Sequence, residues 1–262
     1  MDGLSVHYYA GVEKGIHKGS ATDFDEAVWF NTLARALYIE EVLTRHSTIM
    51  DTYDPEKKIG MMVDEWGCWH DVEPGTNPGF LYQQNTMRDA LTAGVSLNIF
   101  NKHCDRIKMA CIAQIVNVLQ SVILTEGKKM LLTPTYHVFH MYKHHQDAEL
   151  VESWLEGTGK IGLKEQEMVP DVQESVSVDK DGVLTITLNN LSPEEDRQIE
   201  VVLTKKEPSR IEAKIVRGRM QSYNTFEEPE QVKEEAFTQI QVTDRGLSFT
   251  MPACSVMMIR VK

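Results

Sequence analysis

The sequence lacks several features that mark broad classes of protein, and each absence reduces the number of function classes to which the protein can belong. Its four cysteines show no paired spacing and no CxxC motif, which is typical of reduced thiols in a cytoplasmic protein. The chain does not open with a basic and then an apolar segment, so no secretory signal is predicted. The longest uncharged stretch, residues 109–125, contains Gln and Asn and is too polar to span a membrane. With a net charge of −12 and no cluster of Lys or Arg, neither nucleic acid nor membrane is an expected partner.

The overall composition is that of an ordinary globular protein. Apolar residues make up 42% and charged residues 25% of the 262 positions, which suffices for one large domain or two small ones. Neutral carbohydrate is compatible with the acidic balance, because binding it needs no basic patch.

One segment stands out chemically. The apolar run at residues 59–63 ends abruptly at Asp64 and Glu65, and Trp66 and Trp69 follow. An apolar run of this length bounded by charge predicts a buried, parallel β-strand. Barrel enzymes place their chemistry at the carboxyl ends of such strands, and tryptophan rings offer flat apolar walls for a sugar ring. The segment indicates a glycoside hydrolase in which Glu65 is the central residue.

The chain changes character near residue 147. Before it, predicted strands at residues 3–9, 59–63 and 106–110 alternate with predicted helices at 25–46, 81–100 and 112–124, which indicates βαβ units. After it, short alternating strands separated by turn signals predict a jelly-roll-like β-sandwich. A (β/α)₈ barrel takes roughly 250 residues. We therefore expect an α/β domain at 1–147, forming the C-terminal half of a TIM barrel whose earlier strands are missing, and an all-β domain at 148–262.

The two neighbouring acids pose a geometric question. Retaining glycosidases use two carboxylic acids roughly 5 Å apart. Neighbours on a strand point to opposite faces, so Asp64 and Glu65 are not expected to form that pair. One is expected to face the barrel mouth and the other to brace the structure, and the residues alone leave open which is which.

Several longer motifs resemble one known family. The segment around Asp64-Glu65-Trp66 is similar to glycoside hydrolase family 51, the α-L-arabinofuranosidases, in the C-terminal portion of those enzymes. Nearly the whole chain takes part in the resemblance, with motifs in the same order: residues 2–9, 63–69, 77–86, 101–106, 112–118 and 133–139.

The resemblance implies a function and assigns roles to individual residues. It implies release of terminal, non-reducing α-L-arabinofuranose from arabinan or arabinoxylan oligosaccharides, with Glu65 as nucleophile and retention of configuration. His7 and Tyr9 match positions near the nucleophile and the sugar, Trp69 matches an aromatic wall, and Gln114 matches an amide that binds sugar hydroxyls. The family needs no cofactor and no metal, and its members often form hexamers.

One departure from the family concerns the acid/base, which is the Glu of an Asn-Glu pair. The sequence contains no Asn-Glu dipeptide. Protonation of the leaving group and activation of water contribute about 10²–10⁴-fold. We therefore expect a C-terminal fragment that needs the other barrel half as partner and is inactive alone.

Other interpretations of these residues remain open. The chain fits a non-catalytic carbohydrate-binding or regulatory remnant, or a related glycosidase of different specificity. On spacing alone His7 is a core histidine, Trp66 a core residue and Gln114 a helix cap. A metal site is geometrically possible for the four histidines at helical spacing, but a polar helix face suits them better: His137, His140, His144 and His145.

Overall fold

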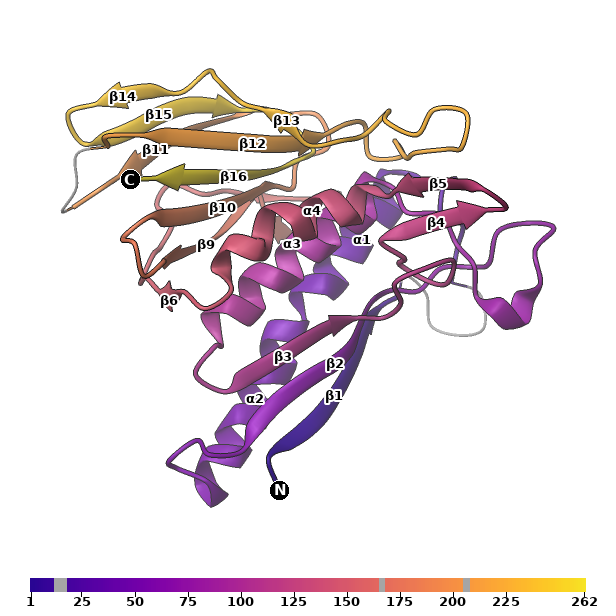
Figure 1. Cartoon of the computed structure of the whole chain (residues 1–262), viewed down its shortest axis with the longest axis horizontal. Coiled ribbons are helices and arrows are strands. Elements are labelled where there is room, and N and C mark those ends of the chain that lie inside the picture. Colours follow the sequence, from indigo (N-terminus) through magenta and orange to yellow (C-terminus); the bar gives the residue numbers. More distant parts are fainter. Residues whose placement is uncertain (12–17, 165–167, 205–207) are drawn as a thin grey trace.

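The computed structural model describes residues 1–11, 18–164, 168–204 and 208–262. Within these ranges the chain forms stacked layers, with a small parallel sheet, a layer of helices and a β-sandwich (Figure 1). None of the helices in the described ranges is long and apolar enough to cross a membrane.

The parallel sheet contains the three strands expected from the first part of the sequence. They are β1 (Gly3–Ala10), β2 (Gly60–Cys68) and β3 (Ile107–Ile112), in the order β1-β2-β3. β2 continues five residues beyond its expected end at residue 63. Asp64 is therefore the central residue of the nine-residue strand, and Glu65 is the residue after it.

Helices cover one face of this sheet. The helix expected at 25–46 is divided at Tyr38 into α1 (Glu26–Leu37) and α2 (Ile39–Tyr53), and Asp25 caps its start by accepting from the Val28 amide. α3 (Met87–Lys102) begins six residues later than expected, because Thr86 and Asp89 form a capping box there. α3 packs between the sheet and the sandwich, and most of its side chains are buried all round.

The prediction of a helix at residues 112–124 is wrong. Residues 113–122 form an irregular loop that leads into the hairpin of β4 (Ile123–Glu126) and β5 (Lys129–Leu132). The side-chain amide of Asn117 binds both the N–H and the C=O of Thr125, and Asn117 and Gln120 adopt φ values of 57° and 45°. These side chains compete with the helical hydrogen bonds, so the apolar spacing of the segment does not produce a helix.

The second half of the chain forms the expected sandwich. Among the described residues, one sheet has six antiparallel strands in the order β13-β12-β16-β10-β9-β6, and the facing sheet has three in the order β11-β15-β14. The strand bounds are Glu149–Leu150 for β6, Val172–Val178 for β9, Leu184–Asn190 for β10, Arg197–Val202 for β11, Ile211–Arg217 for β12, Glu235–Ala236 for β13, Gln241–Thr243 for β14, Gly246–Met251 for β15 and Ser255–Val261 for β16. Short elements complete the fold: η1 (Pro78–Phe80), α4 (Pro134–Tyr142), η2 (Lys143–His145), β7 (Lys160–Ile161) and β8 (Val169–Pro170).

The centre of the six-stranded sheet is buried on both faces. In β16, Met257 and Ile259 belong to the core between the two sheets, whereas Val256 and Met258 belong to the core that contains Trp29. Burial on both sides explains why β16 is apolar in consecutive positions instead of alternating. The helix layer and the sandwich therefore share this strand.

A buried polar network also joins α3 to the sandwich. Asn98 donates to Gln173 Oε1 at 2.8 Å and accepts from the Thr187 hydroxyl at 2.7 Å. Asn189 donates to the same Gln173 oxygen at 2.9 Å and lies directly against Gly94. The expected division into domains 1–147 and 148–262 falls between η2 and β6 and stays a prediction.

Candidate active site

Three of the residues singled out by the sequence meet on neighbouring parallel strands. His7 of β1 lies opposite Glu65 of β2 in the ladder, and Tyr9 lies opposite Gly67. The Tyr9 hydroxyl donates to Glu65 Oε1, and His7 Nδ1 lies 3.3 Å from Glu65 Oε2. The Glu65 side chain is 37% exposed, so its carboxylate is held on two sides and still reaches solvent.

A bulge in β2 determines where the two acids point. From Ser5 to His7 the β1 strand advances two residues while β2 advances three, from Met62 to Glu65. The same extra residue appears against β3, whose Ala110 and Ile112 pair with Val63 and Trp66. A bulge of this kind is common beside active sites, where it redirects a side chain.

The bulge overturns the expectation that Asp64 and Glu65 face opposite sides. The His7 ring approaches both carboxylates, with Nε2 3.3 Å from Asp64 Oδ1 and Nδ1 3.3 Å from Glu65 Oε2. Asp64 also accepts a hydrogen bond from the Ser5 hydroxyl at 2.7 Å. Strict alternation fails here because the extra residue interrupts the pleat.

Two ionisable groups at the site have shifted pKa values. Burial, together with the hydrogen bond to Glu65 and its charge, raises the pKa of the Tyr9 hydroxyl. The hydrogen bond from Ser5 is the largest cause that lowers the pKa of Asp64, and the nearby His7 acts in the same direction. Tyr9 is therefore a neutral donor at ordinary pH, and Asp64 is a carboxylate.

An aromatic wall stands beside these groups. The Trp69 ring makes an edge contact with Tyr9, with centroids 5.2 Å apart, and the Lys18 ammonium lies 4.6 Å from the Trp69 ring centre. Trp66 instead points into the core, is 1% exposed and packs against Phe100 and Phe139. The core position expected for Trp66 is confirmed.

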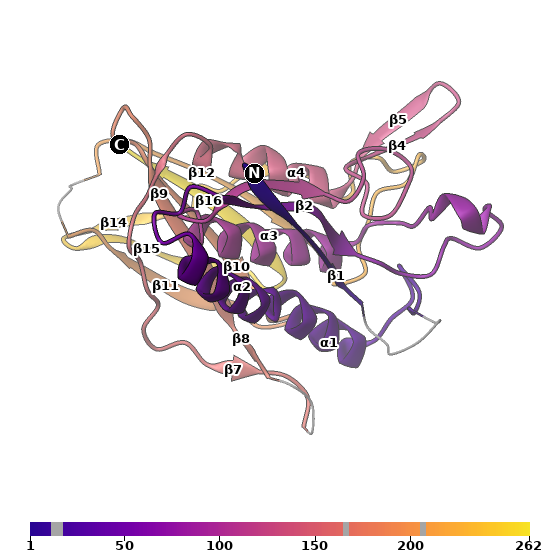
Figure 2. The same cartoon turned by 90° about the horizontal axis from the view of Figure 1, so that it is seen from below.

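Gln114 lies on the loop that follows β3 and not at the start of a helix. Its side chain is exposed, and the backbone of Ala113 donates to Trp66 O at 2.8 Å, so Gln114 follows directly after the end of the sheet. Figure 2 shows the loops after β2 and β3 gathered at this same end of the sheet. Within the described residues no hydrogen bond joins Gln114 to Glu65.

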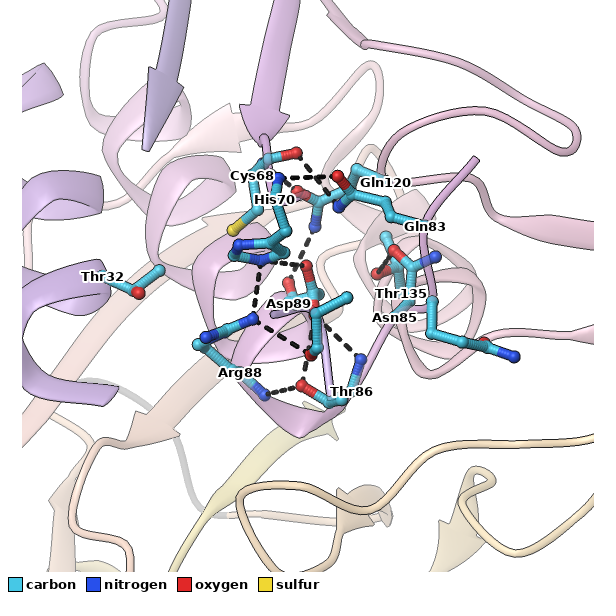
Figure 3. A network of polar contacts seen from close by, with 12 residues as sticks. Thr32, Cys68, His70, Gln83, Asn85, Thr86, Arg88, Asp89, Gln120 and Thr135 are labelled. Carbon is cyan, nitrogen blue, oxygen red and sulfur yellow. Dashed lines mark hydrogen bonds and ion pairs between the residues drawn. The ribbon is translucent and has the colours of Figure 1, made fainter. Parts of the chain in front are cut away.

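Sequence reasoning missed a buried polar cluster behind the site. Cys68, His70 and Asp89 offer potential ligand atoms within 4.8 Å of one another, and all three are buried (Figure 3). Arg88 NH2 lies 2.9 Å from His70 Nε2, and this guanidinium is itself fully buried. A second cation beside a buried guanidinium is electrostatically unfavourable, so the cluster suits hydrogen bonding better than a metal ion. The residues come from β2, the loop after it and α3, which no local sequence pattern connects.

The four histidines at helical spacing do not converge. His140 of α4 contacts Glu234 at 2.6 Å, and His145 contacts the hydroxyls of Ser177 and Thr187. His137 and His140 border a pocket of about 430 Å³, and the described residues that line it include none of the predicted site residues. The polar helix face expected for the histidines describes this arrangement better than a metal site.

Comparison with known proteins places the chain in a family. Residues 64–255 match the family of the alpha-L-arabinofuranosidase C-terminal domain. An intracellular exo-alpha-L-arabinofuranosidase of Bacteroides ovatus is 44% identical across 100% of this chain, which covers 51% of that protein. An intracellular exo-alpha-(1->5)-L-arabinofuranosidase of Halalkalibacterium halodurans is 30% identical over 52% of this chain and 28% of its own length.

Solved structures agree with this match. The GH51 arabinofuranosidase from Xanthomonas axonopodis pv. citri superposes with a TM-score of 0.97 at 43% identity, over 100% of this chain and 53% of that one. An arabinose complex of the Thermotoga maritima enzyme shares the fold, with a TM-score of 0.79 at 21% identity, and this chain covers 52% of it. The chain thus spans about half the length of the relatives that it matches along its whole length. The chain belongs to the alpha-L-arabinofuranosidase C-terminal domain family, within glycoside hydrolase family 51.

Proposed function

We propose that this site carries the nucleophile of a retaining glycosidase that releases terminal α-L-arabinofuranose from arabinan or arabinoxylan oligosaccharides. The observation that carries the proposal is the Glu65 carboxylate, which the Tyr9 hydroxyl and the His7 ring hold beside Trp69. Two relatives, which are named as exo-arabinofuranosidases, support this choice of sugar.

The proposed reaction has two displacements. A Glu65 oxygen attacks the anomeric carbon while the bond to the leaving oxygen breaks, and an acid donates a proton to that oxygen. Water, deprotonated by the same group, then attacks the anomeric carbon and releases both arabinose and the Glu65 carboxylate, with retention of configuration.

The other site residues have supporting roles in this proposal. Tyr9, which remains a neutral donor, orients the Glu65 carboxylate and stabilises its charge until the attack. His7 binds both Glu65 and Asp64 and fixes their relative position. Trp69 supplies the apolar wall of the sugar subsite, and Gln114 binds sugar hydroxyls from the loop after β3. No cofactor and no metal take part.

We further propose that the acid/base comes from polypeptide outside these 262 residues. The sequence contains no Asn-Glu pair, and the chain spans about half of its relatives. Within the described residues β1 and β3 each pair on one side only. Further parallel strands at those edges would complete a (β/α)₈ barrel, and this chain alone would be inactive. A cytoplasmic location fits the relatives, which are named intracellular.

Hydrolysis of an aryl α-L-arabinofuranoside tests the proposal in two arms. The chain is assayed alone and after co-expression with the N-terminal half of the Bacteroides ovatus relative. We expect activity in the complemented sample, with retained configuration by NMR, and a loss of at least 10³-fold in Glu65→Gln. Asp64→Asn is the matched control, because Asp64 is the neighbouring carboxylate on the same histidine, and a smaller loss is expected.

Either of two results would contradict this function. A folded, complemented sample without activity, or one whose activity survives Glu65→Gln, removes Glu65 as nucleophile. The absence of an Asn-Glu pair favours a non-catalytic carbohydrate-binding remnant as the second candidate. That candidate requires arabino-oligosaccharide binding that Trp69→Ala abolishes, without turnover in either arm.

A further inference from the structure

Two buried glutamines bind the backbone on either side of Trp69 in the sequence. Gln120 Oε1 accepts from the Cys68 N–H, and Gln83 Oε1 accepts from the His70 N–H at 2.7 Å. Gln83 Nε2 also donates to the Cys68 carbonyl at 3.4 Å. Because β2 ends at Cys68, the two side-chain amides provide the hydrogen bonds that a neighbouring strand would otherwise supply (Figure 3).

The glutamine contacts are anchored to α3. Gln120 Nε2 donates to the Asp89 carbonyl at 3.0 Å, in the first turn of α3. Asp89 in turn forms the capping box with Thr86 and contacts His70 at 3.3 Å. Gln83 and Gln120 are both 0% exposed, so water does not offer an alternative partner to the peptide groups that they bind.

Gly67 is the residue that permits this close approach. Its φ is 146°, and a Cβ at this position would lie 2.8 Å from Gln120 Oε1 and 3.2 Å from Gln120 Cβ. A side chain at residue 67 would therefore displace Gln120 and add backbone strain. The glycine lies inside β2, two residues after Glu65 and two residues before Trp69.

We propose that Gln83 and Gln120 are positioning residues that hold Trp69 in place as the wall of the sugar subsite. This inference rests on the proposed function for the role of the wall, but the positioning itself does not require catalysis. The Trp69 ring is only partly buried and contacts Tyr9 and Lys18. Its direction is therefore set mainly by the backbone of Cys68 and His70, which the two amides fix.

Replacement of either glutamine by methionine removes the side-chain amide and keeps a side chain of similar shape. Met has a similar length and cannot bind the peptide groups, so buried N–H groups of Cys68 or His70 lose their partners. The segment then relaxes, and Trp69 becomes more mobile. Because stacking on a sugar acts in the ground state and the transition state alike, we expect the KM of the complemented enzyme for an aryl arabinofuranoside to rise about tenfold, with a smaller change in kcat.

Tryptophan fluorescence tests the positioning without any turnover. In a Trp154→Phe background, Trp29 and Trp66 are 0% and 1% exposed, so an ionic quencher reaches Trp69 selectively. We expect Gln83→Met and Gln120→Met to raise the quenching constant at least twofold and to lower the anisotropy of the quenchable emission. Asn224→Leu is the matched control, since Asn224 is another buried amide, which binds Leu132 and Val232.

The outcomes separate this inference from the proposed function. Unchanged quenching and anisotropy in folded Gln→Met variants, or the same change in Asn224→Leu, would overturn the positioning role. If the variants do not fold, amide hydrogen exchange in the parent chain decides, because the inference requires Cys68 and His70 to be as protected as residues inside β2. Failure of the Glu65 assay with positive fluorescence would remove the sugar-wall role and leave the positioning intact.

Discussion

The Tyr9 hydroxyl reaches across from β1 and donates to Glu65 Oε1 on β2, so the candidate nucleophile is held by a residue 56 positions earlier in the chain. The contact depends on the parallel register, which sets Tyr9 opposite Gly67, two residues after Glu65. The direction of that carboxylate therefore depends on the pairing of β1 with β2.

Removal of this donor should reduce activity more than stability. A hydrogen bond to a charged group contributes about 1.5–3 kcal/mol, so Tyr9→Phe should lower kcat/KM of the complemented enzyme by about 10- to 100-fold. Tyr8→Phe is the control, because the Tyr8 hydroxyl donates to the Arg35 carbonyl on α1 and belongs to the helix side of the sheet. Equal losses in the two variants would contradict a specific role for Tyr9.

Gly94 should tolerate no side chain. A Cβ at this position would overlap Asn189 Oδ1 and lie 3.0 Å from Asn189 Cγ, in a network buried between α3 and β10. We expect Gly94→Ala to lower the free energy of unfolding by about 1–3 kcal/mol in urea titrations, because a tight interface is overpacked. Gly79→Ala, where the nearest atom to a Cβ is 3.4 Å away, should change it by less than about 0.5 kcal/mol.

Arg106 should not be replaceable by lysine. Its side chain is fully buried and donates to the carboxylates of Asp51 and Asp54 and to the carbonyls of Ile59 and Asp54. Lysine offers a single charged centre in place of this fork, so Arg106→Lys should cost about 2–4 kcal/mol in the free energy of unfolding. Arg45→Lys, in an exposed pair with Glu41, should be nearly neutral. Similar losses in both would show that fork geometry is irrelevant.

His145 should make the fold less stable in mild acid. Burial, with a smaller contribution from the charge of His144, lowers its pKa to about 4, and its ring nitrogens contact the hydroxyls of Ser177 and Thr187. In the unfolded chain the pKa is about 6.5, so below that pH the unfolded state binds a proton that the folded state does not. The stability contributed by neutral His145 is therefore full above about pH 6.5 and is lost as the pH falls towards 4.

The size of this effect follows from the difference in pKa. The shift corresponds to a loss of about 3 kcal/mol between pH 7 and pH 4. Urea titrations of the parent chain and of His145→Gln at pH 7, 5.5 and 4.5 isolate the contribution of His145. The carboxylates contribute equally to the pH dependence of the two proteins, so their effect cancels in the comparison. The parent should lose more stability than the variant, and parallel pH profiles would refute the assignment.

Periodic apolar patterns predicted the sheet and the sandwich well. The strands of the parallel sheet and of the sandwich are present because alternation or apolar runs report burial directly. The same reasoning failed for residues 113–122, where Asn117 and Gln120 use their amides to bind backbone elsewhere. The apolar spacing of that loop resembles a helix, but its polar side chains decide the local structure.

The site was less accessible to sequence reasoning. Glu65 stands out as an acid at the end of an apolar strand, whereas the grouping of Glu65 with His7 and Tyr9 came from family resemblance. The bulge at Asp64 and Glu65 depends on pairing with two other strands, so no pattern within β2 reveals it. The roles proposed for these residues, and for Trp69 and Gln114, stay predictions.

The burial of β16 on both faces has a consequence for how the chain unfolds. Pulling the helix layer away would expose Val256 and Met258, while opening the sandwich would expose Met257 and Ile259 on the same strand. Neither the helix layer nor the sandwich can unfold without exposing one face of β16, on which the other also packs. We therefore expect heat to unfold the chain in a single cooperative transition, with calorimetric and van't Hoff enthalpies that agree.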